Sequence, residues 1–301
     1  MNKRIIKQYF VLILLVVMFI TLWIFMSLIQ NEALGTFSDT YSPRLDHIVI
    51  IVEENRSMSS LIGNRNAPYI NELATEGAIA TNYHAISKNP YIAMTSGALT
   101  NIPNSCIPLK SECQAHVANI TDEIESSGRS WKMYAESMPA PCTFKDGKKY
   151  TIRHNPFMFY RSISSDKIQC FGNIVPYSEL LTDLNNHTLP DYVFISPNLC
   201  NDMHNCGISI GDRWLSQNIP IILNSTDFTM QHSLLVITWD EGSKVDDRVL
   251  TIFLGPAARH GYRSKGSYNH YSLLHTVEYA WKLKPMTKND KNANLMIDML
   301  K

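Results

Sequence analysis

The stretch HIVIIVEEN, residues 47–55, decides the fold class of this chain. It places a run of β-branched apolar residues, 48–52, directly before two acids. A continuous run of this kind, without polar alternation, is typical of a strand that is buried on both faces in a parallel sheet. Similar runs recur in DYVFISPN (191–198), SLLVITWDEG (233–242) and RVLTIFLGP (248–256).

Helical patterns lie between these predicted strands. PYINELATEG (68–77) and NITDEIESSG (119–128) each end on a glycine, a common helix stop. SLLHTVEYAWKL (272–283) repeats apolar residues at helical spacing and indicates a core-facing helix. Strands that alternate with helices predict an α/β fold whose central, mostly parallel sheet is flanked by helices. The Pro-, Cys- and Ser-rich stretch 100–180 is expected to be an insertion over the sheet edge.

The N-terminal region predicts a membrane anchor. Residues 9–29 form an apolar run without a charge, long enough to cross a bilayer as a helix. Lys3, Arg4 and Lys7 precede the run, so the positive-inside rule places the rest of the chain outside the cytoplasm. We therefore expect an uncleaved signal-anchor in residues 1–30, a stalk in 31–44 and one domain in 45–301. The alternative is a cleaved signal peptide and a secreted domain.

Charge and cysteine content narrow the function classes. The chain has 27 basic and 27 acidic residues; without the three N-terminal cations, 24 basic residues face 27 acidic ones, which argues against nucleic acid as a partner. The six cysteines all lie in the part predicted outside the cytoplasm, and their spacing does not match a zinc site. Six cysteines allow fifteen pairings. Our hypothesis is that neighbours pair, as Cys106–Cys113, Cys142–Cys170 and Cys200–Cys206.

Polar residues follow the predicted strands at the points where ligands bind in open α/β sheets. Carboxylates follow the strands at 47–52, 191–195 and 233–239, and the first of these strands is also followed by an amide. Imidazoles come after the strand at 191–195 and in the loop around 270. Acids and histidines that converge from separate strands suit a divalent metal ion that binds a phosphate. The oxygen ligands favour a hard or borderline cation, with Zn, Ca, Mn and Mg all open.

Seven ordered segments carry a family resemblance: HIVIIVEENRS, TSGALT, RHNPF, PNLCNDMHNC, GDRWL, VITWDEG and NHYSLLHTVEYAWKL. Together they resemble the phosphoesterase family of bacterial acid phosphatases and phospholipases C over roughly residues 45–285. The resemblance implies an alkaline-phosphatase-like fold with the site at the carboxyl edge of the sheet.

The resemblance also implies roles for individual residues. It makes Glu54 and Asn55 the first metal-binding pair and Asp240 and Glu241 a second acidic pair. The polar and histidine side of the site would comprise Asp202 and His270 as metal ligands, His154 and His204 as catalytic groups, and Asn155 and Asn198 as substrate-binding groups. The histidines could instead complete a second metal site, and the residues alone leave this open.

Ser87 is the expected nucleophile. The family pattern H-P-S-x-P-N-Y precedes T-S-G, and counting back from Gly97 without a gap places Ser87 at the serine position. This chain departs from the family pattern at Asn89-Pro90, because the pattern has proline before asparagine. Thr95 and Ser96 are the alternatives, expected to start a helix.

We therefore expect a metal-assisted, acid phosphatase-like phosphomonoesterase that uses a serine nucleophile outside the cytoplasm. Its substrate would be a phosphorylated small molecule or a lipid. The alternatives are a phospholipase C-type phosphodiesterase and a non-catalytic cell-surface module that keeps the fold.

Overall fold

A computed structural model describes residues 18–22, 43–103 and 106–301. The chain separates into two units, Met1–Ser42 and Pro43–Lys301. In the first unit the described residues, 18–22, are helical. None of the helices within the described ranges combines the length and the apolar character that a membrane crossing requires. The predicted span at 9–29 lies mainly outside these ranges, as do residues 31–42 of the predicted stalk.

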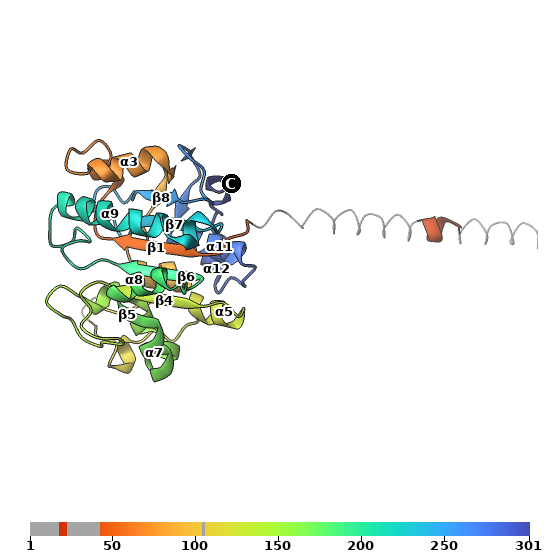
Figure 1. Cartoon of the computed structure of the whole chain (residues 1–301). Helices are drawn as coiled ribbons and strands as arrows, with labels where there is room; N and C mark the ends of the chain where they lie inside the picture. The colour runs from red at the N-terminus through yellow and green to blue at the C-terminus, as the bar shows by residue number, and fades with distance from the viewer. Residues whose placement is uncertain (1–17, 23–42, 104–105) are drawn as a thin grey trace, which may run out of the picture. The chain divides into compact units, whose positions relative to one another are not determined.

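The second unit is built on an eight-stranded sheet in the order β5-β4-β6-β1-β7-β8-β2-β9 (Figure 1). Its strands are β1 (Ile48–Glu53), β2 (Ala78–Ala80), β4 (Trp131–Ala135), β5 (Ile174–Pro176), β6 (Tyr192–Ser196), β7 (Leu234–Trp239), β8 (Thr251–Leu254) and β9 (Arg263–Ser264). Strand β8 runs antiparallel to β7 and β2, whereas β1, β4, β5, β6 and β7 are mutually parallel. A small second sheet pairs β3 (Tyr83–His84) with β10 (Tyr268–Asn269).

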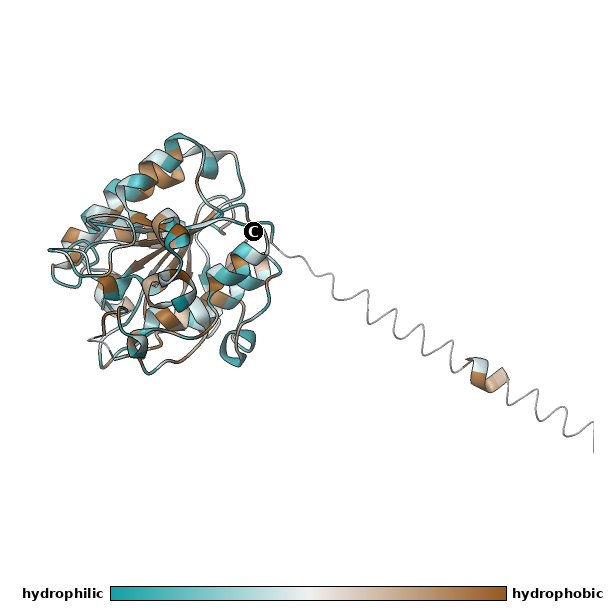
Figure 2. Cartoon of the chain, turned by 90° about the horizontal axis from the view of Figure 1, so that it is seen from below, coloured by the Kyte–Doolittle hydropathy of each residue, from teal (hydrophilic) through white to brown (hydrophobic). Residues whose placement is uncertain are grey.

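Helices cover both faces of the large sheet. They are α2 (Met58–Leu61), α3 (Pro68–Glu76), α4 (Pro90–Ser96), α5 (Ile120–Ser126), α6 (Arg161–Ser164), α7 (Lys167–Asn173), α8 (Ser178–Asn185), α9 (Ile208–Leu223), α10 (Thr226–Thr229), α11 (His270–Ala280) and α12 (Lys288–Lys291). Short 3₁₀ turns occupy Ser111–Cys113, Ile152–His154, Pro156–Phe159 and Ile297–Met299. Helix α3 packs on α9, and α4 packs on α11. Figure 2 shows the apolar strands in the middle of the domain with helices of mixed polarity around them.

The apolar runs explain which strands form the centre. Every residue of β1, β6 and β7 is buried, as expected for strands with helices on both faces. The predicted glycine stop at Gly77 has a different cause from the one expected. Its φ is −81°, and an added Cβ would lie 2.7 Å from the carbonyl oxygen of Phe253, so close packing on β8 requires the glycine.

The stretch 100–180 is not an insertion over the sheet edge. It contributes β4 and β5, which extend the sheet beyond β6 in parallel register. Trp131–Ala135 contains Lys132 and is short, so its sequence lacked the long apolar run of the other strands. The three disulfides join Cys106 to Cys113, Cys142 to Cys170 and Cys200 to Cys206, which confirms the predicted neighbour pairing.

Candidate active site

Three adjacent parallel strands, β6, β1 and β7, end at the same edge of the sheet. The backbone links two of these ends, because the amide of Glu54 donates to the carbonyl of Asp202 at 2.9 Å. This is the carboxyl edge, where open α/β sheets bind ligands. The residues that follow the three strands carry most of the predicted site: Glu54, Asn55, Asp202, His204, Asp240 and Glu241.

A buried cluster of Glu54, His154 and Asp202 forms the centre of this edge. One nitrogen of His154, Nε2, lies 3.4 Å from Oε1 of Glu54, and Nδ1 lies 3.1 Å from Oδ2 of Asp202. One ligand atom from each residue can be chosen so that all three atoms lie within 4.8 Å of one another. Two carboxylates and one imidazole at this spacing form a donor set that suits a divalent metal ion.

The cluster has more negative charge than its protein partners balance. Asp240 adds a third buried carboxylate, and the ion pairs in the described ranges give Glu54 and Asp202 only His154. Burial and the charge of Asp240 raise the pKa of Glu54 well above its usual value. Burial likewise raises the pKa of Asp240 to about 7 and lowers the pKa of His154. A bound divalent cation would supply the missing positive charge and keep these carboxylates ionised.

Tyr91 touches two members of the cluster and was not predicted as a site residue. Its hydroxyl donates to Oε1 of Glu54, and its ring stacks on His154 with centroids 5.5 Å apart and planes 11° apart. Tyr91 is the second residue of α4 and is 6% exposed. A tyrosine at the start of an apolar helix is usually a core residue, so the sequence contained no signal for this role.

Asp240 is fixed by the turn that follows β1. Its Oδ1 accepts the backbone amide of Asn55 at 3.0 Å, and Asn55 adopts a left-handed conformation with φ 48°. Behind it, Nε2 of His270 donates to the Asp240 carbonyl at 2.7 Å, and Nδ1 contacts the Tyr83 hydroxyl at 3.0 Å. His270 is fully buried, and burial lowers its pKa to about 4. The structure places His270 as a support for Asp240, and its role as a metal ligand stays a prediction.

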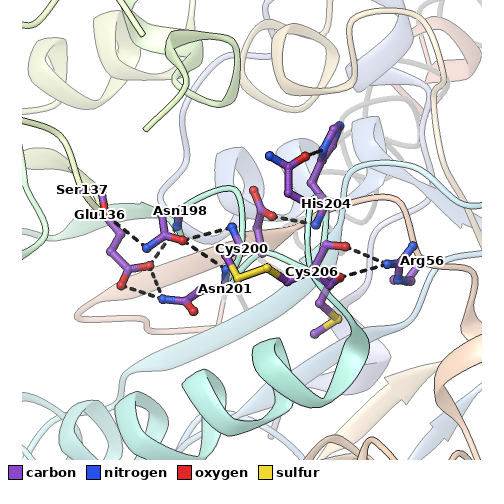
Figure 3. Close-up of a disulfide and its surroundings, with 11 residues drawn as sticks. Arg56, Glu136, Ser137, Asn198, Cys200, Asn201, His204 and Cys206 are labelled. Atoms are coloured by element: carbon purple, nitrogen blue, oxygen red, sulfur yellow. Dashed lines mark hydrogen bonds between the residues drawn. A yellow bond between two sulfur atoms is a disulfide. The ribbon is translucent and has the colours of Figure 1, made fainter. Parts of the chain in front are cut away.

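The loop after β6 is held by a disulfide and an arginine (Figure 3). Cys200 and Cys206 close a loop that contains Asp202 and His204. Arg56, which follows Asn55, donates to the carbonyls of Met203 at 2.7 Å and of Cys206 at 3.3 Å. Inside the loop, Oδ1 of Asp202 accepts the amide of His204 at 2.8 Å. These contacts hold the loop against the end of β1.

Asn198 braces the start of this loop. Its Oδ1 accepts the amides of Cys200 and Asn201 at 3.0 and 3.2 Å, and its backbone amide donates to Glu136 at 2.9 Å (Figure 3). Asn155 is fully buried, and its Nδ2 donates to the Tyr150 hydroxyl at 3.3 Å. Neither asparagine lines the pocket that lies over the Glu54–His154–Asp202 cluster, so substrate binding by Asn155 and Asn198 remains a prediction.

A pocket lies over the cluster and has a polar and an apolar part. The strand ends and the loops that follow supply Glu54, Asn55, Arg153, His154, His204, Asp240 and Glu241. The start of α4, the segment after it and the turn 156–159 supply Asn89, Pro90, Tyr91, Ile92, Ile102, Pro103, Pro156 and Phe159. His204 and Arg153 are exposed here, so both can reach a bound substrate.

Ser87 does not line this pocket. It is exposed and lines a neighbouring hollow with Lys88, Asn89, Asn101, Ile102 and Pro103, three of which the two hollows share. Thr95 and Ser96 do not start a helix but close α4, where their hydroxyls donate to the carbonyls of Tyr91 and Ile92 at 2.6 and 2.8 Å. Ser87 stays a prediction as the nucleophile, and the structure places it beside the main pocket.

The family is decided by comparison with known proteins. The profile of the Phosphoesterase family matches residues 63–284. The chain belongs to the phosphoesterase family. As a member, this phosphoesterase is a hydrolase that acts on phosphoric ester bonds.

Three curated relatives resemble this phosphoesterase. A phosphatidylinositol-3-phosphatase of Mycobacterium tuberculosis is 32% identical over 85% of this chain and 83% of its own length. A phosphate-repressible acid phosphatase of Penicillium chrysogenum and a probable acid phosphatase of Kluyveromyces lactis are each 28% identical. They are matched over 83% and 88% of this chain, which spans 62% and 65% of their lengths.

Solved structures confirm the predicted fold of this phosphoesterase. An alkaline phosphatase superfamily protein from Vibrio parahaemolyticus aligns with a TM-score of 0.59 and 14% identity, over 85% of this chain and 72% of the other. A lipoteichoic acid synthase from Listeria monocytogenes aligns with a TM-score of 0.57 and 10% identity, over 84% and 78%. At these identities the likeness concerns the fold alone, which is the alkaline-phosphatase-like α/β fold with a mostly parallel sheet.

Proposed function

We propose that this phosphoesterase is a phosphomonoesterase that works outside the cytoplasm with a divalent metal ion and a serine nucleophile. The observation that carries the proposal is the buried Glu54–His154–Asp202 cluster with Asp240 beside it. Three buried carboxylates without a lysine or arginine partner in the described ranges form a site that a cation would complete. The names of the Penicillium chrysogenum and Kluyveromyces lactis relatives, an acid phosphatase and a probable acid phosphatase, support a monoester substrate.

The metal ion would be held by Glu54, Asp202 and Asp240, with His154 as the nitrogen ligand and Asn55 and Glu241 at the rim. It would supply positive charge that stabilises the oxygens of the transferring phosphoryl group. Burial lowers the pKa of His154 and so favours the neutral imidazole, which is the form that binds a metal.

The remaining steps belong to Ser87 and His204. Oγ of the exposed Ser87 would attack phosphorus and give its proton to solvent water, and the bond from phosphorus to the alcohol oxygen would break to leave a phosphoserine. His204 is exposed in the pocket and could give the leaving alcohol its proton. Its Nδ1 donates to Oδ1 of Asn205 at 2.7 Å, which leaves Nε2 for the substrate. Water would then hydrolyse the phosphoserine.

A phospholipase C-type phosphodiesterase is the alternative. The apolar part of the pocket, which includes Ile92 and Phe159, would suit the body of an amphiphilic ester. Hydrolysis of a phosphatidyl diester with little activity on monoesters would favour this alternative.

We further propose that residues 9–29 anchor the domain to a membrane, with the site on the extracytoplasmic side. Three disulfides in Pro43–Lys301 support an oxidising compartment. Protease protection of the domain in sealed cells would contradict this placement.

Activity and metal content together test the central proposal. The full chain should hydrolyse an aryl phosphate monoester, and removal of metal by a chelator should lower turnover at least about a hundredfold. Turnover should return when a divalent metal is added back. Full activity in protein shown by elemental analysis to be free of metal would contradict the metal-assisted mechanism.

A further inference from the structure

The lining of the pocket divides by structural element. Its polar part comes from the ends of β1 and β7 and from the loops that carry His154 and His204. Its apolar part comes from three other places: the start of α4, residues 102–103, and the 3₁₀ turn Pro156–Phe159. Helix α4 packs directly on that turn, and residues 102–103 line the same pocket. We call this apolar part the apolar subsite; it consists of Ile92, Ile102, Pro103, Pro156 and Phe159.

The apolar subsite itself offers no side-chain hydrogen bond to a hydroxyl group, and the polar Ser87, Lys88 and Asn101 line the neighbouring hollow and not the main pocket. The side chains of the subsite have no hydrogen-bonding atoms, and the adjoining Asn89 already donates its Nδ2 to the carbonyl and hydroxyl of Thr100 at 2.9 and 3.2 Å. A polyol placed there would give up hydrogen bonds to water without replacement, which is unfavourable. Burial of an alkyl or aromatic group on this surface would instead be favourable in free energy, because it removes apolar surface from water.

The part of the subsite that α4 and the 3₁₀ turn supply is built as a rigid surface. Pro90 is the first residue of α4 and Pro156 is the first residue of the 3₁₀ turn Pro156–Phe159, so a proline ring fixes φ where each element begins. Ile92 and Phe159 are 5% and 6% exposed, so their packing also fixes them. A preformed apolar surface spends little free energy on ordering when a ligand binds.

We propose that the apolar subsite binds the alcohol portion of the substrate and selects esters whose alcohol has an apolar body, alkyl or aromatic, over esters of polyols. This rests on the proposed function, because it places the phosphoryl group over Glu54, His154 and Asp202.

The test measures the turnover of phosphate monoesters by the full-length protein. The esters differ in their alcohol. Hexyl phosphate and glycerol 1-phosphate are both esters of primary alcohols and have similar leaving groups, so their kcat/KM ratio reports binding of the alcohol. A buried methylene contributes about fourfold, so hexyl phosphate should be favoured at least about tenfold. A third substrate, 1-naphthyl phosphate, tests whether the subsite binds a ring. Its turnover is compared between protein variants and not with the turnover of the other two esters.

Ile102→Ser is the discriminating variant and Leu99→Ser is its matched control. Leu99 lies in the same segment and is 58% exposed, but it does not line the pocket. Ile102→Ser should lower the hexyl-to-glycerol ratio by about fivefold or more, whereas Leu99→Ser should leave the ratio at its wild-type value. A fall in 1-naphthyl phosphate turnover in the same variant would support a subsite that also takes rings, whereas an unchanged hexyl-to-glycerol ratio in Ile102→Ser would overturn the subsite.

Binding separates failure of this proposal from failure of the proposed function. Hexylphosphonate and methylphosphonate cannot be hydrolysed, and calorimetry on metal-loaded protein measures their affinities directly. Tighter binding of hexylphosphonate, weakened by Ile102→Ser, supports the subsite even if no ester is hydrolysed. Equal affinities, or equal kcat/KM for hexyl and glycerol phosphate, would overturn it.

Discussion

At the scale of single residues, Tyr91 links two groups that the proposed mechanism uses. It donates to Glu54 and stacks on His154, so it acts on the metal-binding cluster through these residues. Partners of metal ligands typically account for about 10–100-fold in metal affinity or activity. Tyr91→Phe keeps the ring and removes the donor, whereas Tyr91→Leu removes both.

We predict that Tyr91→Phe weakens the affinity for divalent metal about tenfold or more, and that Tyr91→Leu has a larger effect. Titration of metal-free protein measures this without any turnover. Tyr262→Phe is the control, because Tyr262 also donates to a carboxylate, Asp298 at 3.2 Å, but lies outside the pocket. Unchanged metal affinity in Tyr91→Phe would make Tyr91 a packing residue only.

Ser87 carries the sharpest residue-scale prediction, since it lies in the hollow beside the main pocket. Loss of a covalent nucleophile should lower turnover more than about a thousandfold, whereas loss of a neighbouring group leaves partial activity. Ser87→Ala should therefore be folded, able to bind metal and inactive. Acid quenching of the wild type with labelled substrate should trap phosphate on the peptide that contains Ser87.

Ser178→Ala is the matched control for Ser87, because Ser178 is an exposed serine that begins α8. It should keep full turnover. If Ser87→Ala retains near-normal activity, or if the trapped phosphate is on another peptide, the nucleophile is a different residue and the gapless count from Gly97 is wrong.

At the scale of elements, the loop after β6 combines a short disulfide with two site residues. The Cys200–Cys206 bridge spans 6 positions and the Cys106–Cys113 bridge spans 7. Loops of such similar length should lose similar stability when the bridge is removed, about 2 kcal/mol each in the chain-entropy view. Only the first loop holds Asp202 and His204.

We predict that the double variant Cys200→Ser/Cys206→Ser loses most of its turnover at a temperature where it is still folded. The variant Cys106→Ser/Cys113→Ser should lose comparable stability in denaturant unfolding but keep most of its activity on an aryl phosphate. Equal loss of activity in both variants would show that the bridge after β6 contributes only to stability.

At the scale of the whole molecule, one buried carboxylate away from the pocket should make stability depend on pH. Glu278 of α11 is 0% exposed, and neither carboxylate oxygen has a hydrogen-bond partner in the described part of the chain. Burial, with the nearby charge of Asp290, raises its pKa from 4.5 to about 9. Between these two values the unfolded chain releases a proton that the folded chain keeps, so stability falls as pH rises.

We predict that Glu278→Gln unfolds at a higher temperature than the wild type at pH 8, by several degrees, and that the difference disappears near pH 4.5. Glutamine keeps the shape and cannot ionise. Glu179→Gln in α8 is the control, since Glu179 is exposed, and it should match the wild type at both pH values. A difference that is independent of pH would contradict this origin.

The sequence predicts those strands that have a long, continuous apolar run, and it does not predict short strands of mixed composition. The strands β1, β6 and β7 have long apolar runs, and the acids that follow them pointed to the carboxyl edge, where Glu54 and Asp202 do meet. Strand β4 has a short and mixed sequence, so it was missed. Side-chain contacts such as that of Tyr91 depend on how distant elements pack, which periodicity does not report.

The described domain begins at the opposite edge of the sheet from its pocket. Leu45 accepts a hydrogen bond from Nε1 of Trp281 at 2.8 Å, and the amide of Asp46 donates to the carbonyl of His232 at 3.1 Å, just before β7. The six residues of β1, about 20 Å of extended chain, then lead to Glu54. A label attached at Pro43, the first residue of this unit, would thus lie away from the mouth of the pocket and leave it open.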